Sequence, residues 1–246
     1  MPAASPSETT GPAVELVPTA PPRVAVQDVV AAPKAAALPN VLPKAAVAPD
    51  ASASRVSSSG SAPSVVEPLP VGSKVLHIGD SFAGALGLAL GKRLEERGVR
   101  SVLKHTDASY LTTWAWDDAL GKYLWKYNPD LVLVTLGANE LAIVEPEQRE
   151  RAIKKIVETI GDRPCVWVGI PLWNGPQNGL LEVIRRASAP CRYMDTNALV
   201  DTEHMPRMSD GIHPTAAARE AWADVVVDWL ARERRSNGPM PWSLEP

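Results

Sequence analysis

The sequence predicts an α/β domain in residues 71–235, with a five-stranded parallel sheet covered by helices on both faces. Three observations support this fold class. Short apolar runs alternate with longer amphipathic segments, as in repeated strand–helix units. The run LVLVTL at residues 131–136 is continuously apolar, which is typical of a strand buried on both faces. All eight tryptophans and all four tyrosines follow residue 70, so only this part has the bulk for a core.

Five apolar runs are predicted to form the strands. Each is short and is followed by glycine or polar residues, which end a strand and turn the chain. The strands are expected at residues 74–78, 101–105, 131–136, 166–170 and 192–194. Since the carboxyl ends of parallel strands share one edge, ligands of such sheets bind beyond that edge.

Helices are predicted between the strands and after the last one. Gly98 ends the first helix, and Asn128-Pro129 ends a loop-plus-helix segment, because glycine and proline terminate helices. A long loop at residues 196–214 precedes the closing helix, which Pro214 introduces. The helices are expected at residues 82–97, within 111–127, and at 147–160, 179–187 and 215–232.

The two ends of the chain differ from this domain in composition. Residues 1–70 hold 13 of the 24 prolines and no aromatic residue, which predicts a disordered Pro/Ala-rich linker. Residues 236–246 are predicted to be a flexible tail, with Trp242 as the side chain that would fold back. The first residues lack the basic and apolar regions of a signal peptide, although a leader of this length is typical behind a membrane or lipid anchor.

Charge and hydropathy exclude several classes of function. The formal net charge of −3 provides no basic field for nucleic acid. No run of 18 apolar residues is long enough to span a membrane. No residues have the spacing of metal ligands, so neither a metal nor another cofactor is expected. We expect a monomer acting on a small-molecule or glycan substrate.

The first strand leads directly into Gly79-Asp80-Ser81. Glycine permits a sharp turn, and Asp80 can accept hydrogen bonds from the free N–H groups of the following helix. Ser81 then falls in the first helical turn, where spare amides and the helix dipole favour negative charge. Taken alone, this tripeptide is best interpreted as a helix cap.

Polar side chains also follow the third strand and precede the last helix. Asn139, in LGANE, can donate a hydrogen bond into the crevice without adding charge, although a turn asparagine is the ordinary alternative. In SDGIHP, Asp210 can fold back on His213, accept its Nδ1 proton and leave Nε2 as a base. Together with Ser81 these residues supply a nucleophile, an oxyanion donor, an orienting carboxylate and a base.

This arrangement resembles the SGNH (GDSL-type) hydrolases, through GDS at 79–81, GAN at 137–139 and DGIH at 210–213. The resemblance covers residues 71–230 and implies a flavodoxin-like three-layer α/β/α sandwich that hydrolyses esters without a metal. It implies that Ser81 is the nucleophile, His213 the base and Asp210 its orienting partner. The Ser81 N–H and the Asn139 amide would then bind the oxyanion.

The sequence departs from the family pattern at two positions. The family places a glycine after the second strand, and its N–H is the third oxyanion donor. This chain has HTDASYLTTW there, so Ser109 or Tyr110 must supply that donor, and the choice between them stays open. Glu140 stands where an aspartate often follows the family asparagine, and we expect this change to affect loop support and not chemistry.

A closer resemblance is to bacterial cell-envelope members with the layout PCVWVGIP, PCRYMD and DGIHPT. It implies acyl esters, often acetyl, on glycans or cell-wall polymers as substrates. Two alternatives stay open: an O-acetyltransferase using the same acyl-serine, and a glycan-binding domain of weak activity, which the missing glycine favours. Trp173 follows the fourth strand and is either a stacking platform for a sugar or a plug for its loop.

The two cysteines, Cys165 and Cys191, each follow a proline and each begin a predicted strand. In register on neighbouring strands their Cα atoms would lie about 5 Å apart, which suits a disulfide. Two buried free thiols are the alternative. A disulfide predicts an oxidising compartment, hence a periplasmic or extracellular location, with the cytoplasm as the alternative.

Overall fold

The computed structural model describes residues 68–175 and 177–244. The predicted linker lies outside the described residues up to residue 67. Leu69 is buried, with 5% of its surface exposed, and packs in the core, so the folded part begins slightly before the predicted boundary at residue 71.

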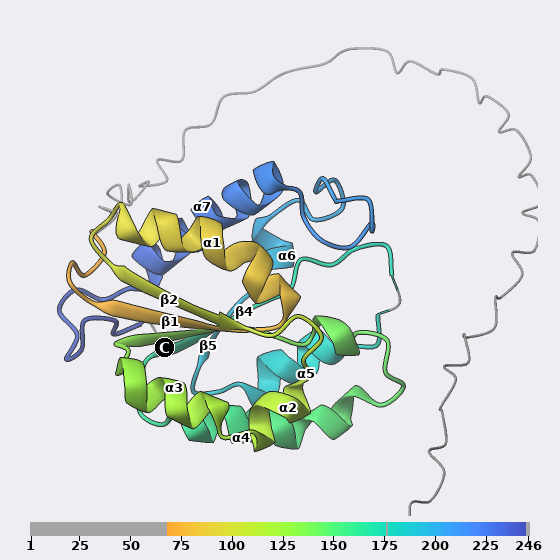
Figure 1. Cartoon of the computed structure of the whole chain (residues 1–246), viewed down its shortest axis with the longest axis horizontal. Helices are drawn as coiled ribbons and strands as arrows, with labels where there is room; N and C mark the ends of the chain where they lie inside the picture. The colour runs from red at the N-terminus through yellow and green to blue at the C-terminus, as the bar shows by residue number, and fades with distance from the viewer. Residues whose placement is uncertain (1–67, 176, 245–246) are drawn as a thin grey trace, which may run out of the picture. The chain divides into compact units, whose positions relative to one another are not determined.

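Five parallel strands form one sheet, as the sequence predicts, and the structure places them in the order β2-β1-β3-β4-β5 (Figure 1). The strands are β1 (Lys74–Gly79), β2 (Arg100–His105), β3 (Leu131–Thr135), β4 (Cys165–Val168) and β5 (Arg192–Met194). The chain moves from β1 to one side through β2 and to the other side through β3. A crevice therefore opens at the carboxyl ends of β1 and β3, the position where flavodoxin-like sheets bind ligands.

Helices cover both faces of this sheet and complete a three-layer α/β/α sandwich. Helices α1 (Ser81–Glu95) and α7 (Ala216–Glu233) lie side by side on one face (Figure 1). The opposite face is covered by α2 (Leu111–Trp116), α3 (Ala119–Tyr127), α4 (Glu150–Ile160) and α5 (Leu180–Ala187). The remaining elements are α6 (Thr196–Leu199) and two 3₁₀ turns, η1 (Ala138–Glu140) and η2 (Pro146–Arg149).

Three predicted segments differ from the observed structure. The segment 111–127 contains two helices, because Asp117 adopts an extended conformation and its carboxylate accepts a bond from the Ala119 N–H. The predicted helix 147–160 begins as the 3₁₀ turn η2 before α4. The predicted loop 196–214 starts with the short helix α6, which the Asp195 carboxylate caps by accepting from the N–H groups of the following turn.

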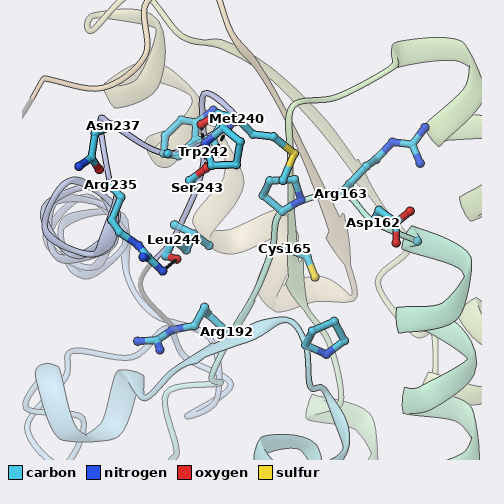
Figure 2. A pocket seen from close by; sticks show the side chains of 15 residues that line it. Asp162, Arg163, Cys165, Arg192, Arg235, Asn237, Met240, Trp242, Ser243 and Leu244 are labelled. Atoms are coloured by element: carbon cyan, nitrogen blue, oxygen red, sulfur yellow. Dashed lines mark hydrogen bonds between the residues drawn. The ribbon is translucent and has the colours of Figure 1, made fainter.

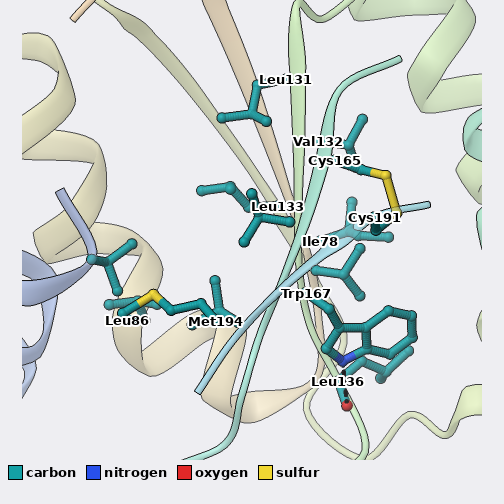
Figure 3. Packing of buried hydrophobic residues seen from close by; sticks show 14 of the residues in the cluster. Ile78, Leu86, Leu131, Val132, Leu133, Leu136, Cys165, Trp167, Cys191 and Met194 are labelled. Carbon is teal, nitrogen blue, oxygen red and sulfur yellow. Dashed lines mark hydrogen bonds between the residues drawn. A yellow bond between two sulfur atoms is a disulfide. The ribbon is translucent and has the colours of Figure 1, made fainter. Parts of the chain in front are cut away.

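The core is built around the central strands (Figure 3). Every residue of β3 is buried, which confirms the interpretation of LVLVTL as an interior strand. The edge of the sheet at β4 and β5 is joined by a Cys165–Cys191 disulfide, with the two Cα atoms 4.7 Å apart. Because Val166 pairs with Arg192, the two cysteines are in register at the amino end of the sheet.

The segment after α7 folds back onto the amino end of the sheet. The Trp242 side chain is fully buried, and its Nε1–H donates to the Ser73 Oγ at 3.0 Å. Leu244 forms a bridge with Arg234. Trp242 therefore folds back, as expected from the sequence, and this one large side chain anchors residues 237–244 to the domain.

Candidate active site

The connection from β1 to α1 places Ser81 at the carboxyl edge of the sheet. Gly79 has a φ of +150° and lies against β3, where an added Cβ would stand 1.8 Å from the Thr135 carbonyl oxygen. Only glycine permits this close approach. Asp80 is the N-cap of α1 and Ser81 is the first helical residue, which exposes the hydroxyl toward the crevice.

Asp80 also ties β1 to the loop after β3. Its Oδ1 accepts from the Phe82 N–H at 2.9 Å, as the sequence predicts for a cap. Its Oδ2 accepts from the N–H groups of Gly137 and Ala138, at 3.0 and 2.9 Å. Burial raises the pKa of Asp80 to about 6, although these three bonds act in the opposite direction. The second role depends on distant backbone groups, which the local sequence does not indicate.

Ser81, His213 and Asp210 form one hydrogen-bonded chain across the crevice. The His213 Nε2 lies 2.8 Å from the Ser81 Oγ, and its Nδ1 lies 2.8 Å from the Asp210 Oδ2. The pKa of Asp210 is lowered to about 2, first by its bond with His213 and then by bonds from the N–H groups of Ile212 and His213. Since the carboxylate only accepts, the proton of His213 belongs on Nδ1, and Nε2 accepts from the serine hydroxyl.

The loop that carries His213 is held by Arg207, a residue that sequence reasoning missed. The Arg207 guanidinium donates to the carbonyl of Ile212 at 2.8 Å and to that of Leu172 at 2.7 Å. The Met208 N–H donates to the His213 carbonyl at 2.8 Å. These bonds join the histidine loop to the loop after β4. An arginine near a DGIH motif carries no local signal of this role.

Trp173 packs on Phe82 and does not line the cleft around Ser81. Its ring stacks on Phe82 with centroids 5.5 Å apart, and Phe82 in turn lies 5.2 Å from the His213 ring. Trp173 lines a neighbouring cavity of about 340 Å³. Of the two interpretations of Trp173, a plug for its loop describes this packing, and a stacking platform would have to use the neighbouring cavity.

The cleft around Ser81 has a volume of about 450 Å³, and most of the residues that line it are polar or charged. His105 borders it, and its Nδ1 lies 3.0 Å from the Asp107 carboxylate. The lining residues are Ser81, Gly84, Ala85, His105, Asp107, Ala108, Asn139, Met208, Asp210, His213 and Arg219. A larger cavity of about 770 Å³ lies at the amino end of the sheet, between the C-terminal segment and β4 (Figure 2). None of the catalytic candidates lines it.

The predicted oxyanion donors meet at one atom, the carbonyl oxygen of Asp107. The Ser81 N–H donates to it at 3.3 Å and the Asn139 Nδ2 at 3.1 Å. The Ser109 N–H donates to the Thr106 carbonyl at 3.1 Å, so this amide is engaged in the loop. Tyr110 precedes α2, and within the described part of the chain its N–H has no hydrogen-bond acceptor.

The Glu140 side chain holds the loop between β2 and α2 at its α2 end. This side chain is fully buried, its Oε2 accepts from the Leu111 N–H at 2.7 Å, and its Oε1 pairs with Arg149. The longer glutamate thus reaches the first turn of α2 and fixes the end of the loop that bears Tyr110. This contact agrees with the expected role in loop support.

Comparison with known proteins was made at the levels of sequence and structure. No protein-family model matches the chain, and neither does any curated protein. The structure of TesA is similar, with a TM-score of 0.52 at 24% identity over 64% of this chain and 97% of TesA. A lipase/acylhydrolase from Enterococcus faecalis is also similar, with a TM-score of 0.51 at 16% identity over 65% of this chain and 96% of its own. The domain therefore shares the fold of these two structures.

Two further observations concern the described residues of this domain. Across residues 68–175 and 177–244, no group of three or more His, Cys, Asp or Glu side chains is placed to hold a metal ion. Within the same residues, no helix combines the length and the apolar character needed to cross a bilayer.

Proposed function

We propose that this domain is a serine ester hydrolase of the SGNH type. The observation that carries the proposal is the hydrogen-bonded chain Asp210–His213–Ser81, which opens into a cleft at the carboxyl edge of the sheet. This geometry is what a hydroxyl nucleophile needs, because a base lies within hydrogen-bond reach and is itself oriented by a carboxylate. The similarity to a structure described as a lipase/acylhydrolase supports the same reaction class.

The reaction proceeds in two halves. His213 Nε2 takes the proton of Ser81 while the Oγ attacks the ester carbonyl carbon, and Asp210 stabilises the imidazolium. The Ser81 N–H and the Asn139 amide donate to the oxyanion, with Tyr110 the remaining candidate of the two predicted third donors, because the Ser109 amide is engaged. His213 then protonates the departing alcohol, and an acyl-serine remains. Water, deprotonated by His213, then attacks the acyl carbon, and His213 returns that proton to the Ser81 Oγ as the acid leaves.

The cleft favours a short acyl group on a polar alcohol. Its wall holds two histidines, two carboxylates, an amide and an arginine, and it contains few apolar side chains to receive a long acyl chain. We therefore propose acetyl or similarly short esters of glycans or cell-wall polymers as substrates. The Cys165–Cys191 disulfide supports a periplasmic or extracellular location, where such polymers occur.

The decisive experiment is active-site labelling with a fluorophosphonate probe, combined with hydrolysis of p-nitrophenyl acetate. We expect labelling at Ser81 and, for Ser81→Ala, loss of labelling and a fall in kcat of at least roughly 10³-fold. Ser209→Ala is the matched control, because Ser209 is an exposed serine of the same site loop. Wild-type protein that neither reacts with the probe nor hydrolyses the ester would exclude the proposal. Adding a glycan acceptor measures the ratio of transfer to hydrolysis and so tests for an O-acetyltransferase.

A further inference from the structure

The oxyanion site of this domain is filled by the protein itself. The Asp107 carbonyl oxygen accepts from both the Ser81 N–H and the Asn139 Nδ2, the two donors assigned to the oxyanion. The carbonyl oxygen of an ester attacked by Ser81 must occupy the same position, because donors act only at hydrogen-bond distance. The Asp107 carbonyl must therefore leave before the reaction begins.

The carbonyl belongs to the central peptide of a β-turn. The Ser109 N–H donates to the Thr106 carbonyl at 3.1 Å, which closes a four-residue turn with Asp107 and Ala108 in the middle. Ala108 has a negative φ, since Asn128 is the sole non-glycine residue with a positive φ in the described part of the chain. A negative φ at the third position excludes a type II turn and fits type I.

We propose that the Asp107–Ala108 peptide rotates when substrate binds, and that the Ala108 N–H, in place of the Ser109 or Tyr110 N–H expected from the sequence, then becomes the third oxyanion donor. This inference rests on the proposed esterase function. The C=O and N–H of one peptide point in opposite directions, so a half-turn of its plane replaces an acceptor by a donor at the same place. Type I and type II turns differ by this rotation, and both keep the bond between the first and fourth residues.

The residues on either side of this peptide are held in place. The Thr106 N–H donates to the Gly79 carbonyl at 3.0 Å. Ser109 is buried, and its Oγ donates to Thr106 and accepts from the Trp114 Nε1–H, at 2.7 and 2.9 Å. Asn139 Nδ2 uses one hydrogen on the Ser109 carbonyl, at 2.9 Å, which leaves the other for the oxyanion. Rotation of one peptide therefore opens the site without displacing the loop.

The rotated form requires a positive φ at residue 108. Glycine adopts that conformation freely, alanine at a penalty, and β-branched residues hardly at all. The glycine that the family resemblance leads us to expect after β2 is absent here, and alanine is the smallest substitute. The third donor is thus present in this chain but is made available only when the turn changes form.

Two substitutions in the full chain test the inference in opposite directions. Ala108→Gly should raise kcat/KM for p-nitrophenyl acetate by roughly fivefold to tenfold, and Ala108→Val should lower it by at least roughly tenfold. The effect should lie in kcat, because the extra donor acts on the transition state. The rate of Ser81 labelling by the fluorophosphonate should follow the same order. Thermal midpoints identify a variant that has simply lost its fold.

Crystal structures of the wild type with and without the phosphonate adduct give the second readout. In the adduct, the phosphoryl oxygen should accept from the Ser81 N–H, the Asn139 amide and the Ala108 N–H, with the Asp107 carbonyl turned away. An adduct in which that carbonyl keeps its direction overturns the inference, as do glycine and valine variants of equal kcat/KM. If either of these results is found while Ser81 of the wild type is labelled and the wild-type protein hydrolyses the ester, the proposed function stands. A wild type without labelling or hydrolysis removes the proposed function and this inference together.

Discussion

At the scale of single residues, the site shows how one side chain serves both folding and chemistry. Asp80 caps α1 and binds the two amides that begin the loop carrying Asn139. It therefore sets the distance between the proposed nucleophile, Ser81, and the proposed oxyanion donor, Asn139. The cap is predictable, since aspartate before a helix is a common cap. The bridge to β3 is not, because its donors are backbone groups 57 and 58 residues away.

Asp80 also predicts how stability depends on pH. Its pKa is about 6 in the folded protein and 3.8 as an ordinary aspartate, so the folded state binds the proton more tightly. The free energy of unfolding should therefore decrease through this group as pH rises from about 4 to about 6, by roughly 3 kcal/mol. Asp80→Asn removes this titration.

Urea unfolding of the wild type and Asp80→Asn at pH 4, 5, 6 and 7 measures the effect. The stability advantage of the wild type over the variant should shrink with rising pH across this interval and stay constant above it. Parallel stability curves for the two proteins would contradict the raised pKa of Asp80.

At the scale of elements, the β1–α1 connection depends on one close contact between strands. Gly79 ends β1 against the Thr135 carbonyl of β3, and the Asp80 N–H donates to that same carbonyl at 3.2 Å. Both strands deliver site residues at this edge. Glycine at this position is therefore required by the packing of β1 on β3, in addition to the turn that follows.

Gly79→Ala should destabilise the protein by more than about 3 kcal/mol, because the added Cβ would stand 1.8 Å from a backbone oxygen that cannot move freely. Gly121→Ala is the matched control. Gly121 lies within α3, and an added Cβ there meets no atom within 4 Å. We expect a gain of up to about 1 kcal/mol for the control. Denaturant unfolding separates the two, and comparable effects of both substitutions would refute the argument.

At the scale of the whole molecule, the described fold is closed at its amino edge by the C-terminal segment. Trp242 is fully buried, hydrogen-bonded to Ser73, and lies at the end of the sheet opposite Ser81. The disulfide between Cys165 and Cys191 lies at the same edge. Structural reinforcement and the candidate active site are thus separated along the strands.

Trp242→Ala should lower the free energy of unfolding by about 3–5 kcal/mol, since it empties a large buried site. Trp125→Ala, which removes a side chain that is 84% exposed, should change it by no more than about 0.5 kcal/mol. At 20 °C the esterase kcat of both folded variants should equal that of the wild type. Equal losses of stability in the two variants would contradict the role of Trp242 as an anchor. A loss of kcat in Trp242→Ala alone, with that variant still folded, would contradict the separation of the C-terminal segment from the active site.

The sequence by itself determined the fold class and the approximate elements. Alternating strand and helix periods, the interior strand at residues 131–136 and the breaks at Gly98 and Asn128 are local signals, and they depend only on side-chain chemistry. It also placed Ser81 and Asn139 at strand ends, which a parallel sheet gathers at one edge, and Asp210 and His213 in the loop before the closing helix.

Only the tertiary structure decided how these residues meet. Three features depend on partners that are distant in sequence or belong to the backbone. They are the Asp107 carbonyl between Ser81 and Asn139, the Arg207 contacts with the loop of His213, and the burial of Trp242. Backbone carbonyls and amides are present at almost every residue, so no sequence pattern marks the one that faces a nucleophile. Their positions follow from the packing of the complete sheet and its loops.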